Sequence, residues 1–388
     1  MICTPRRVFR NGLIALLFVI SHLCPLWAET ASVAPTGAPP ATDIPPAATT
    51  APALPTSVPH AGTGVPLDDP KYVALFNALI TTHQFDAPYL RSLFAYTALQ
   101  PKIITLFDRP PEQLPFYKYQ PRFITEGLVK QGQAYLASHA ALLEEIEARY
   151  GVPRSIIGGI LGIETKFGQL ELLRYRAFDV LNTGFFLYPR REAFYRSELI
   201  NFLLLCRKDQ VEPLSLFSSY GGALGVPQFM PSSFLKYAVD ENQDGKRDIW
   251  NTAADVFGSV AAYLKAFGWQ THGPLFFKAH LSRDRSQVRE RLGARKILTV
   301  QEAKQQGIEI LAPRDVVSAS DRVSFVFYKP EENTEQMLAI FDNFRVLLDY
   351  NNSVNYALTV IDLAHKISLP PDPADPVANP VKDDKTNF

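Results

Sequence analysis

The sequence predicts a mainly helical α+β protein with a small β-containing insertion. Apolar residues recur at helical spacing along most long segments, whereas strand-like alternation is confined to one region near the C-terminal end. A hydrophobic fraction of 47%, with 26 Phe and 16 Tyr, is ample for a large packed core. Helices are therefore expected at 72–80, 124–150, 256–267 and 356–367, and strands at 323–328 and, more weakly, at 338–348. These strands follow a charged stretch at 283–304, and together the two features indicate a small β insertion at about 276–335.

The first 28 residues have the pattern of an export signal. Arg6, Arg7 and Arg10 precede a short apolar stretch at 12–20, and Ala28 offers a small residue for cleavage. Two alternatives stay open: lipidation at Cys24, and an uncleaved membrane anchor, since residues 11–28 carry no charge. All three place the rest of the chain outside the cytoplasm, and the expected location is the periplasm. In two of them the protein is associated with a membrane through its N-terminus.

The 31 prolines gather toward the two ends of the chain. Residues 29–65 are dominated by Ala, Pro, Thr, Ser and Gly, and the tail 369–388 repeats the pattern. Segments with so few large apolar residues cannot offset the entropy of ordering, so 29–65 is expected to be a disordered, extended spacer and 369–388 a disordered tail. The folded region is therefore predicted at 66–368.

The charge balance argues against a nucleic-acid-binding protein, and the cysteine count argues against a disulfide-stabilised one. The chain has 39 basic and 39 acidic residues, so a nucleic-acid partner is not expected. It has 3 cysteines, and if the first two leave with the export signal, only Cys206 remains and no internal disulfide can form.

The segment 151–168 (GVPRSIIGGILGIETKFG) predicts a helix that carries a catalytic acid. Ile157, Ile160, Leu161 and Glu164 follow the spacing of one helical face, so the carboxyl group lies on an apolar stripe. Burial favours the protonated form of a carboxyl group, which is the form a general acid needs. The alternative is a structural ion pair with an Arg or Lys. The three glycines inside this helix indicate that a neighbour approaches closely.

The segment 218–233 (SSYGGALGVPQFMPSS) predicts a tight, irregular turn in an apolar environment. Gln228 is its one amide, and it either binds a ligand or is satisfied within a buried structural turn. A phosphate loop is excluded because no Gly-Lys-Ser/Thr follows.

The segment 240–251 (DENQDGKRDIWN) resembles a calcium loop in part. Positions 1, 3, 5 and 6 of such a loop are occupied by Asp240, Asn242, Asp244 and Gly245. Position 12 is Asn251 instead of Glu, so Asp255 would have to complete the shell in a longer loop. The alternative is an acidic surface turn.

The segment 349–356 (DYNNSVNY) suits either sugar recognition or the capped start of a helix. Tyr rings stack on sugars and Asn amides bind their hydroxyl groups, whereas Ser353 or Asn352 is also a good N-cap.

Five motifs in one order carry a family resemblance: GILGIET, YPRR, GGALGVPQFMPSS, DENQDGKRDIW and YNNSVNYA. Together they closely resemble the membrane-bound lytic murein transglycosylase B family of bacterial cell-wall enzymes, over about 66–368. The resemblance implies a lysozyme-like core at about 151–275 and 336–368, a helical lobe at 66–150 and the β insertion at 276–335. It also implies cleavage of the β-1,4 bond between N-acetylmuramic acid and N-acetylglucosamine, which leaves a 1,6-anhydromuramoyl end, with no cofactor for catalysis.

The resemblance assigns roles to individual residues. Glu164 matches the sole catalytic acid/base. The substrate-binding residues that it implies are Ser219, Gln228, Tyr119, Arg190, Arg191, Tyr263, Tyr350, Asn351 and Tyr356. A structural Ca²⁺ is implied at Asp240, Asn242, Asp244, the Lys246 carbonyl and Asp255. Val226-Pro227 departs from many relatives, and the weak lipidation motif puts an outer-membrane anchor in doubt. Glycan strands of peptidoglycan are the expected partner, together with proteins of cell-wall assembly.

The chemistry agrees with this assignment. Glycoside hydrolases usually need two carboxylates, and neither segment that frames the predicted site supplies a second one; Asp179, the nearest downstream, would have to fold back. A transglycosylase avoids that need because the sugar supplies its own nucleophile. The rival hypotheses are a hydrolytic muramidase on the same scaffold, a non-catalytic peptidoglycan-binding protein and a calcium-binding structural protein.

Overall fold

The computed structural model describes residues 64–107, 114–170, 173–282 and 286–368. The predicted export signal and the predicted tail lie outside the described residues, as does the predicted spacer up to residue 63. None of the helices in the described ranges is long and apolar enough to cross a lipid bilayer.

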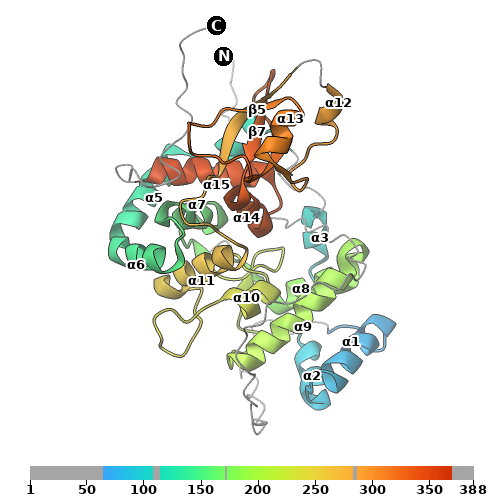
Figure 1. Cartoon of the computed structure of the whole chain (residues 1–388). Coiled ribbons are helices and arrows are strands. Elements are labelled where there is room, and N and C mark those ends of the chain that lie inside the picture. Colours follow the sequence, from blue (N-terminus) through green and yellow to red (C-terminus); the bar gives the residue numbers. More distant parts are fainter. Residues whose placement is uncertain (1–63, 108–113, 171–172, 283–285, 369–388) are drawn as a thin grey trace, which may run out of the picture.

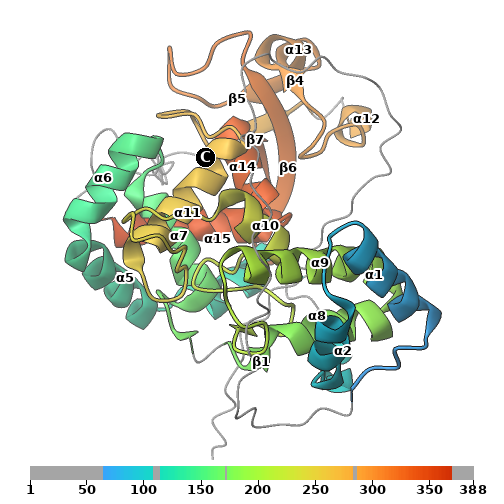
Figure 2. The same ribbon diagram turned by 90° about the horizontal axis from the view of Figure 1, so that it is seen from below.

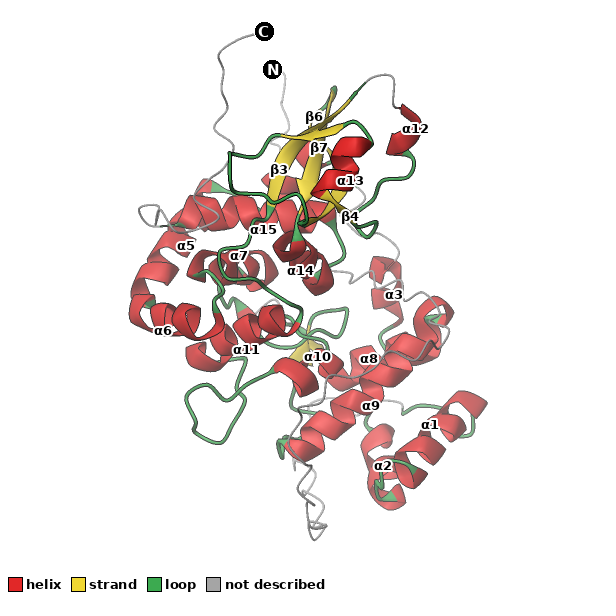
Figure 3. Cartoon of the chain, viewed as in Figure 1, coloured by secondary structure: helices red, strands yellow, loops and turns green. Residues whose placement is uncertain are grey.

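Helices make up most of the described chain, and short strands are interspersed among them (Figure 3). The helices are α1 (Pro70–Thr81), α2 (Ala87–Ala95), α3 (Pro101–Phe107), α4 (Phe116–Tyr119), α5 (Glu126–Ser138), α6 (Ala140–Tyr150), α7 (Arg154–Thr165), α8 (Ala177–Leu187), α9 (Glu192–Lys208), α10 (Pro231–Tyr237), α11 (Ala253–Ala266), α12 (Ser286–Arg289), α13 (Val300–Gln305), α14 (Asp342–Tyr350) and α15 (Val354–Ile367), with 3₁₀ turns η2 (Gln120–Arg122) and η4 (Pro189–Arg191). The strands are β1 (Tyr175–Arg176), β2 (Phe217–Ser218), β3 (Phe276–Leu281), β4 (Leu298–Thr299), β5 (Ile308–Ile310), β6 (Arg322–Glu331) and β7 (Thr334–Ile340).

Helix α7 is the centre of the fold. Each of its residues from Ser155 to Thr165 is buried, and the helix packs against α5, α6, α11 and α15 (Figure 1). A Cβ added at Gly159 would lie 2.6 Å from the carbonyl oxygen of Val360 in α15. The close neighbour that the glycines predict is therefore the backbone of α15 at Gly159, whereas Gly158 and Gly162 are approached by side chains of α5, of α15 and of Phe167.

The prediction of a single long helix at 124–150 is wrong, because a turn at His139 separates α5 from α6. Helix α5 packs on α7 and α15, whereas α6 packs chiefly on α11, and the turn at His139 redirects the chain between these neighbours. The His139 ring packs against Tyr135 and Phe257, with ring centroids 4.6 and 5.4 Å apart. Apolar spacing continues through the turn at Leu136, Leu143 and Ile146, so the pattern alone could not reveal the break.

Two pairs of helices from the predicted helical lobe at 66–150 lie in different parts of the fold. Helices α1 and α2 lie beside α8 and α9, where the Tyr72 ring packs edge-on against Phe185 at 5.3 Å. Helices α5 and α6 lie on the opposite side of the molecule, as the two views in Figures 1 and 2 agree.

The insertion folds as an antiparallel sheet of five strands in the order β4-β6-β7-β3-β5. One face of β6 and β7 joins the main core through Val326 and Leu338, whereas the other face forms a smaller core with Phe325 and Met337. The sheet ends at Ile340, slightly beyond the predicted boundary near 335.

The weak strand predicted at 338–348 is correct only up to Ile340, where α14 follows. Phe344, Leu347 and Leu348 repeat at helical spacing and are fully or almost fully buried, which explains why the chain turns helical there. The buried Arg345 of α14 donates to Ser324 Oγ and to the Ile340 carbonyl, each at 3.0 Å, and so ties α14 to the sheet.

Candidate active site

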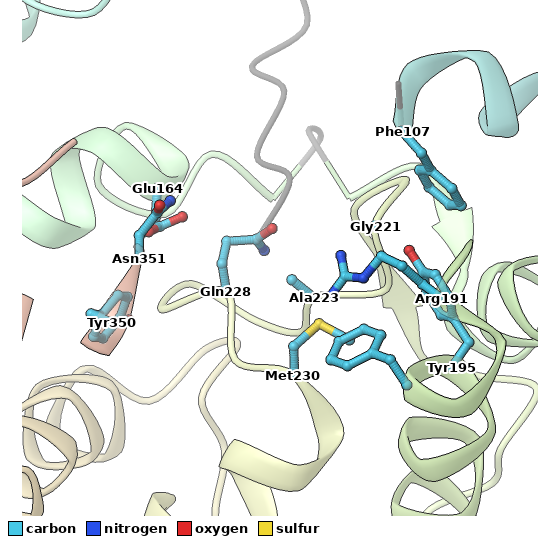
Figure 4. Close-up of a pocket in the computed structure, with 11 residues that line it drawn as sticks. Phe107, Glu164, Arg191, Tyr195, Gly221, Ala223, Gln228, Met230, Tyr350 and Asn351 are labelled. Atoms are coloured by element: carbon cyan, nitrogen blue, oxygen red, sulfur yellow. The ribbon is translucent and has the colours of Figure 1, made fainter. Parts of the chain in front are cut away.

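Glu164 lies in the last turn of α7 and lines a pocket between α7, α9, α14 and the turn at 221–230 (Figure 4). Its side chain is 5% exposed, as its place on the apolar stripe predicts. Tyr356 Oη in α15 donates a hydrogen bond to Glu164 Oε1 at 2.7 Å. The alternative prediction, a structural ion pair of this carboxyl group with an Arg or Lys, stays open.

Two buried tyrosines lie beside Glu164. Burial raises the pKa of Tyr350 and of Tyr356 well above the ordinary value, and the negative charge of Glu164 adds to the shift in both. Both phenols therefore stay protonated at any pH at which the protein would work. Tyr356 consequently remains a hydrogen-bond donor to Glu164 in both protonation states of the carboxyl group.

The turn that carries Gln228 is held in place from both sides of the pocket. Tyr350 Oη donates to the carbonyl of Pro227 at 2.6 Å, and Thr165 Oγ1 donates to the carbonyl of Val226 at 3.1 Å. Gln228 itself has a left-handed backbone with φ 55°, and its Nε2 donates to the Gly225 carbonyl at 2.8 Å. The turn is thus fixed relative to α7 and α14, and Gln228 both lines the pocket and closes the turn.

Arg191 forms the opposite side of the pocket (Figure 4). Its guanidinium group lies over the ring of Phe194, with 4.0 Å between the group and the ring centroid. Burial lowers the pKa of Arg191, and the neighbouring Tyr195 and Glu198 partly oppose that shift. Its Nη2 is buried and has no hydrogen-bond partner in the described part of the chain, so a donor is available to a bound group.

The structure brings most of the predicted site residues together. Five of them line the same pocket: Glu164, Arg191, Gln228, Tyr350 and Asn351. Tyr356 contacts Glu164 directly, and Asn351 Oδ1 is buried without a hydrogen-bond partner in the described chain.

Besides Tyr356, four predicted residues lie outside the set that lines this pocket. Tyr119 is fully buried, with its ring centroid 4.6 Å from that of Phe123. Tyr263 donates to the carbonyl of Asp349 at 2.7 Å and packs edge-on against the ring of Tyr350. Ser219 Oγ accepts a hydrogen bond from Ala223 N at 3.3 Å and closes the turn. Arg190 is exposed. Direct contact of these four with a ligand stays a prediction.

Several pocket residues escaped the sequence-based prediction. They are Phe107, Phe194, Tyr195, Gly221, Ala223 and Met230. Phe107 and Tyr195 stack with ring centroids 5.5 Å apart, although 88 residues separate them in the chain, and no pattern in the sequence links them. Met230 lies within the motif GGALGVPQFMPSS, which could have suggested it.

Glu164 alone carries a carboxyl group among the described residues that line this pocket. Asp179 is committed elsewhere, because Arg176 Nη2 donates to it at 2.8 Å and Ala98 N at 2.9 Å. The pocket therefore offers one proton donor and acceptor, held by Tyr356, and not the usual pair of carboxylates.

The loop at 240–255 has the oxygen donors that a calcium ion prefers. Asp240 accepts from the backbone N of Asp244 and of Gly245 at 3.1 and 2.8 Å, and Asp244 accepts from Lys246 N at 2.9 Å. Gly245 makes the turn with φ 89°. The oxygen-bearing side chains of this loop, and their order along the chain, are typical of a site for a hard cation such as Ca²⁺.

Asp255 at the other end of this loop is fully buried. It accepts from Glu241 N and Asp248 N, each at 2.8 Å, and burial raises its pKa, with the charge of Asp240 adding to the shift. Within the described ranges, no group of three or more Asp, Glu, His or Cys side chains is arranged so that it could hold a metal ion. The Asn242 amide and the Lys246 carbonyl would thus have to contribute to any calcium shell.

Comparison with known proteins identifies the family. The model of the transglycosylase SLT domain matches residues 68–365, which is most of the described chain. The chain belongs to the transglycosylase SLT domain family. The match begins and ends close to the limits of the predicted folded region, 66–368.

Similar proteins agree with this family. The membrane-bound lytic murein transglycosylase B of Escherichia coli is 35% identical over 212 residues, which cover 52% of this chain and 58% of that relative. The soluble lytic transglycosylase SltB1 of Pseudomonas aeruginosa is 35% identical with a TM-score of 0.69, over 77% of this chain and 98% of that one. The Escherichia coli lytic transglycosylase Slt35 in complex with calcium is 28% identical with the same TM-score, over 79% and 96%. These neighbours of the SLT domain family confirm the predicted lysozyme-like, mainly helical α+β fold.

Proposed function

We propose that the protein is a peptidoglycan lytic transglycosylase that cleaves the β-1,4 bond between N-acetylmuramic acid and N-acetylglucosamine. The observation that carries the proposal is the pocket with a single carboxyl group, Glu164, held by Tyr356 at 2.7 Å. The family match and the names of the similar proteins support the same activity.

In the proposed mechanism Glu164 first acts as the acid. It donates its proton to the glycosidic oxygen, and the C1–O bond breaks while the 2-acetamido group of the muramic acid assists departure. Glu164 then removes the proton of the C6 hydroxyl group, and that oxygen forms a bond to C1. The product is a 1,6-anhydro ring, no water is consumed, and the second carboxylate of an ordinary glycosidase is not required.

The surrounding residues have distinct parts in this cycle. Tyr356 orients the carboxyl group by its hydrogen bond and stabilises the carboxylate that forms after the first proton transfer. The apolar and aromatic lining keeps water from the reacting centre, which protects the intermediate from hydrolysis. Arg191 Nη2 and Asn351 Oδ1, both without partners in the described chain, are placed to bind polar groups of the substrate.

Product analysis tests the proposal. Purified peptidoglycan is digested with the wild-type protein, and the soluble fragments are weighed by mass spectrometry. Anhydromuramoyl ends, lighter by one water than reducing ends, are expected. Reducing ends would instead identify a hydrolytic muramidase, and the absence of soluble fragments would identify a non-catalytic peptidoglycan-binding protein. Glu164→Gln serves as the negative control.

A structural calcium ion is part of the proposal. Asp240, Asn242, Asp244, the Lys246 carbonyl and Asp255 would hold it, and the calcium complex of the similar Slt35 supports this assignment. The loop lies outside the residues that line the Glu164 pocket, so the ion would stabilise the fold and take no part in catalysis.

We infer that the protein works outside the cytoplasm. The predicted export signal at 1–28 supports a periplasmic location, and the predicted spacer at 29–65 would give the catalytic region reach toward the murein layer. The name of the membrane-bound relative is consistent with attachment through the N-terminus. Glycan strands are the expected partner, and proteins of cell-wall assembly are a further expected class.

A further inference from the structure

The chain leaves α7 directly after Glu164 and Thr165 through an unusual turn. Lys166, Phe167 and Gly168 all have left-handed backbone, with φ of 49°, 61° and 93°. Among the described non-glycine residues with positive φ, Phe167 has the one apolar side chain, since the others are Gln, Lys, His and Asp. This conformation is unfavourable for a bulky residue, so the surrounding structure must hold Phe167 in it.

The Phe167 ring lies in a narrow socket between α5 and α7. A Cβ added at Gly132 of α5 would lie 2.6 Å from Cζ of this ring, and one added at Gly162 of α7 would lie 2.7 Å from the same atom. Tyr135 of α5 packs against the ring, with 5.2 Å between the two centroids. The two glycines leave room for the ring and for little more, so the packed ring fixes the backbone that carries it.

Hydrogen bonds hold the same turn to α7 and to α5. Lys166 N donates to the carbonyl of Gly162 at 3.1 Å. Phe167 N donates to the carbonyl of Leu161, also at 3.1 Å. From α5, Gln131 Nε2 donates to the carbonyl of Lys166 at 2.9 Å. The turn therefore closes the end of α7 and joins it to a neighbouring helix.

The turn is also connected to the opposite wall of the pocket. Thr165 Oγ1 accepts from Gly168 N at 3.2 Å and donates to the carbonyl of Val226 at 3.1 Å. Val226 precedes Gln228 in the turn that lines the pocket, so one hydroxyl group links that turn to the end of α7. A shift of the backbone after Thr165 would therefore move Glu164 relative to the pocket.

We propose that Phe167 is a positioning residue for the Glu164 carboxyl group. Its packed ring holds the left-handed turn, the turn fixes the end of α7, and the carboxyl group is thereby kept in contact with Tyr356 and aimed at the bond that is cleaved. Phe167 itself is not among the residues that line the pocket. A displacement of about 1 Å at a reacting group can cost about a hundredfold in rate. The inference rests on the proposed function, because that function defines the reaction of Glu164.

The kinetics of Phe167→Leu test the proposal. Leucine is apolar but has no ring to fill the socket, so kcat on purified peptidoglycan should fall about tenfold to a hundredfold, with KM changed less than about twofold. Phe85→Leu is the matched control, because Phe85 is also buried and lies between α1 and α2, outside the residues that line the pocket. It should keep the wild-type kcat at a temperature at which both variants are folded. Equal kcat in the two variants would overturn the proposal.

The titration of Glu164 is a second readout, which needs no activity. Nuclear magnetic resonance follows the carbon-13-labelled Glu carboxyl groups of the full chain, and Glu164→Gln assigns the signal. A displaced carboxylate loses part of its hydrogen bond from Tyr356, so its titration should move to higher pH in Phe167→Leu and stay in place in Phe85→Leu. An unmoved titration in Phe167→Leu would contradict the proposal. Failure here is separable from failure of the proposed function, which would appear as wild-type digests without anhydromuramoyl ends.

A milder variant keeps the test decisive if Phe167→Leu does not fold. Gln131→Ala removes only the hydrogen bond from α5 to the Lys166 carbonyl and should lower kcat about twofold to fivefold. Gln133→Ala is the matched control, because it removes a hydrogen bond from the same helix to the Lys366 carbonyl, 3.2 Å long, and should keep the wild-type kcat. Equal kcat in these two variants would show that the turn does not position the carboxyl group.

Discussion

Tyr356 Oη lies 2.7 Å from Glu164 Oε1, and this hydrogen bond joins α15 to the end of α7 across 192 residues of sequence. Burial and the charge of Glu164 raise the pKa of Tyr356 so far that the phenol is always the donor. One carboxyl oxygen is thereby occupied in both protonation states. This hydrogen bond therefore orients the carboxyl group whether or not it carries a proton.

Tyr356→Phe should lower kcat about tenfold to a hundredfold and leave KM nearly unchanged, because the carboxylate loses a donor without losing its surroundings. The charged carboxylate becomes less stable, so the limb of the pH–kcat profile that reflects deprotonation of Glu164 should move to higher pH. Steady-state kinetics on peptidoglycan at several pH values measure both effects. Tyr328→Phe, which removes a hydrogen bond to Gln336 within the sheet, is the control. An unmoved profile in the Tyr356 variant would exclude the contact from catalysis.

Glu164→Gln should reduce the release of anhydromuramoyl fragments by at least about a thousandfold, because an amide can neither donate nor accept the catalytic proton. The amide has nearly the same shape, so the melting temperature should change little. Glu145→Gln on the exposed face of α6 is the matched control and should retain full activity. Residual activity of the Gln variant near that of the control would assign catalysis to another group.

The sequence predicted α7 and the position of Glu164 because apolar spacing and helix boundaries are local features. It also pointed to α11 and α15 and to the strand β6. The break at His139 was not predictable, since the apolar pattern runs through it and tertiary neighbours decide the turn. For the same reason α14 was misassigned in part, because its helical spacing follows directly on the strand β7.

The site was predictable in its motifs but not in its contacts. Gln228 and Glu164 stand out as polar residues in apolar segments. Phe107 and Tyr195 carry no such signal, and they reach the pocket only because α3 and α9 pack near it. The role of Tyr356 depends on how α15 lies against α7, a long-range relationship that residue spacing does not contain.

Glu198 should make the stability of the protein depend on pH. Burial raises its pKa above the ordinary value of 4.5, although hydrogen bonds from Ser232 oppose the shift. The folded state then holds a proton that the unfolded state releases. The free energy of unfolding should fall as pH rises from about 4.5 to the raised pKa, and it is fully retained below that window.

Glu198→Gln should flatten this dependence, since its amide oxygen can still accept from Ser232 N but no longer titrates. Urea unfolding at several pH values measures the slope for both proteins. Glu144→Gln, an exposed carboxyl group on α6, should keep the wild-type slope. A slope that is the same in all three proteins would show that Glu198 does not titrate differently in the folded state.

Asp244→Ala should abolish the response of stability to calcium. A site saturated at a hundred times its dissociation constant adds about 2.7 kcal/mol to the free energy of unfolding, so calcium should raise the melting temperature of the wild-type protein and chelation should lower it. The variant is expected to show neither change and to keep its activity at low temperature. Asp68→Ala, which removes an exposed carboxylate before α1, should respond like the wild type. A calcium response in the Asp244 variant would place the ion elsewhere.

Gly159→Ala should destabilise the protein by about 1–3 kcal/mol, the usual cost of overpacking a core. The added methyl group would lie 2.6 Å from the Val360 carbonyl, and backbone cannot move aside as a side chain can. Helices α7 and α15 would separate, and the contact between Glu164 and Tyr356 would lengthen, so activity should fall together with stability. Gly127→Ala is the matched control: it lies in α5, where the nearest atom to its added Cβ is 4.0 Å away. That variant should be as stable as the wild type or slightly more so, because alanine favours the helix. If Gly159→Ala matched the control in urea unfolding, close packing of α7 on α15 would not be what positions Glu164 and Tyr356.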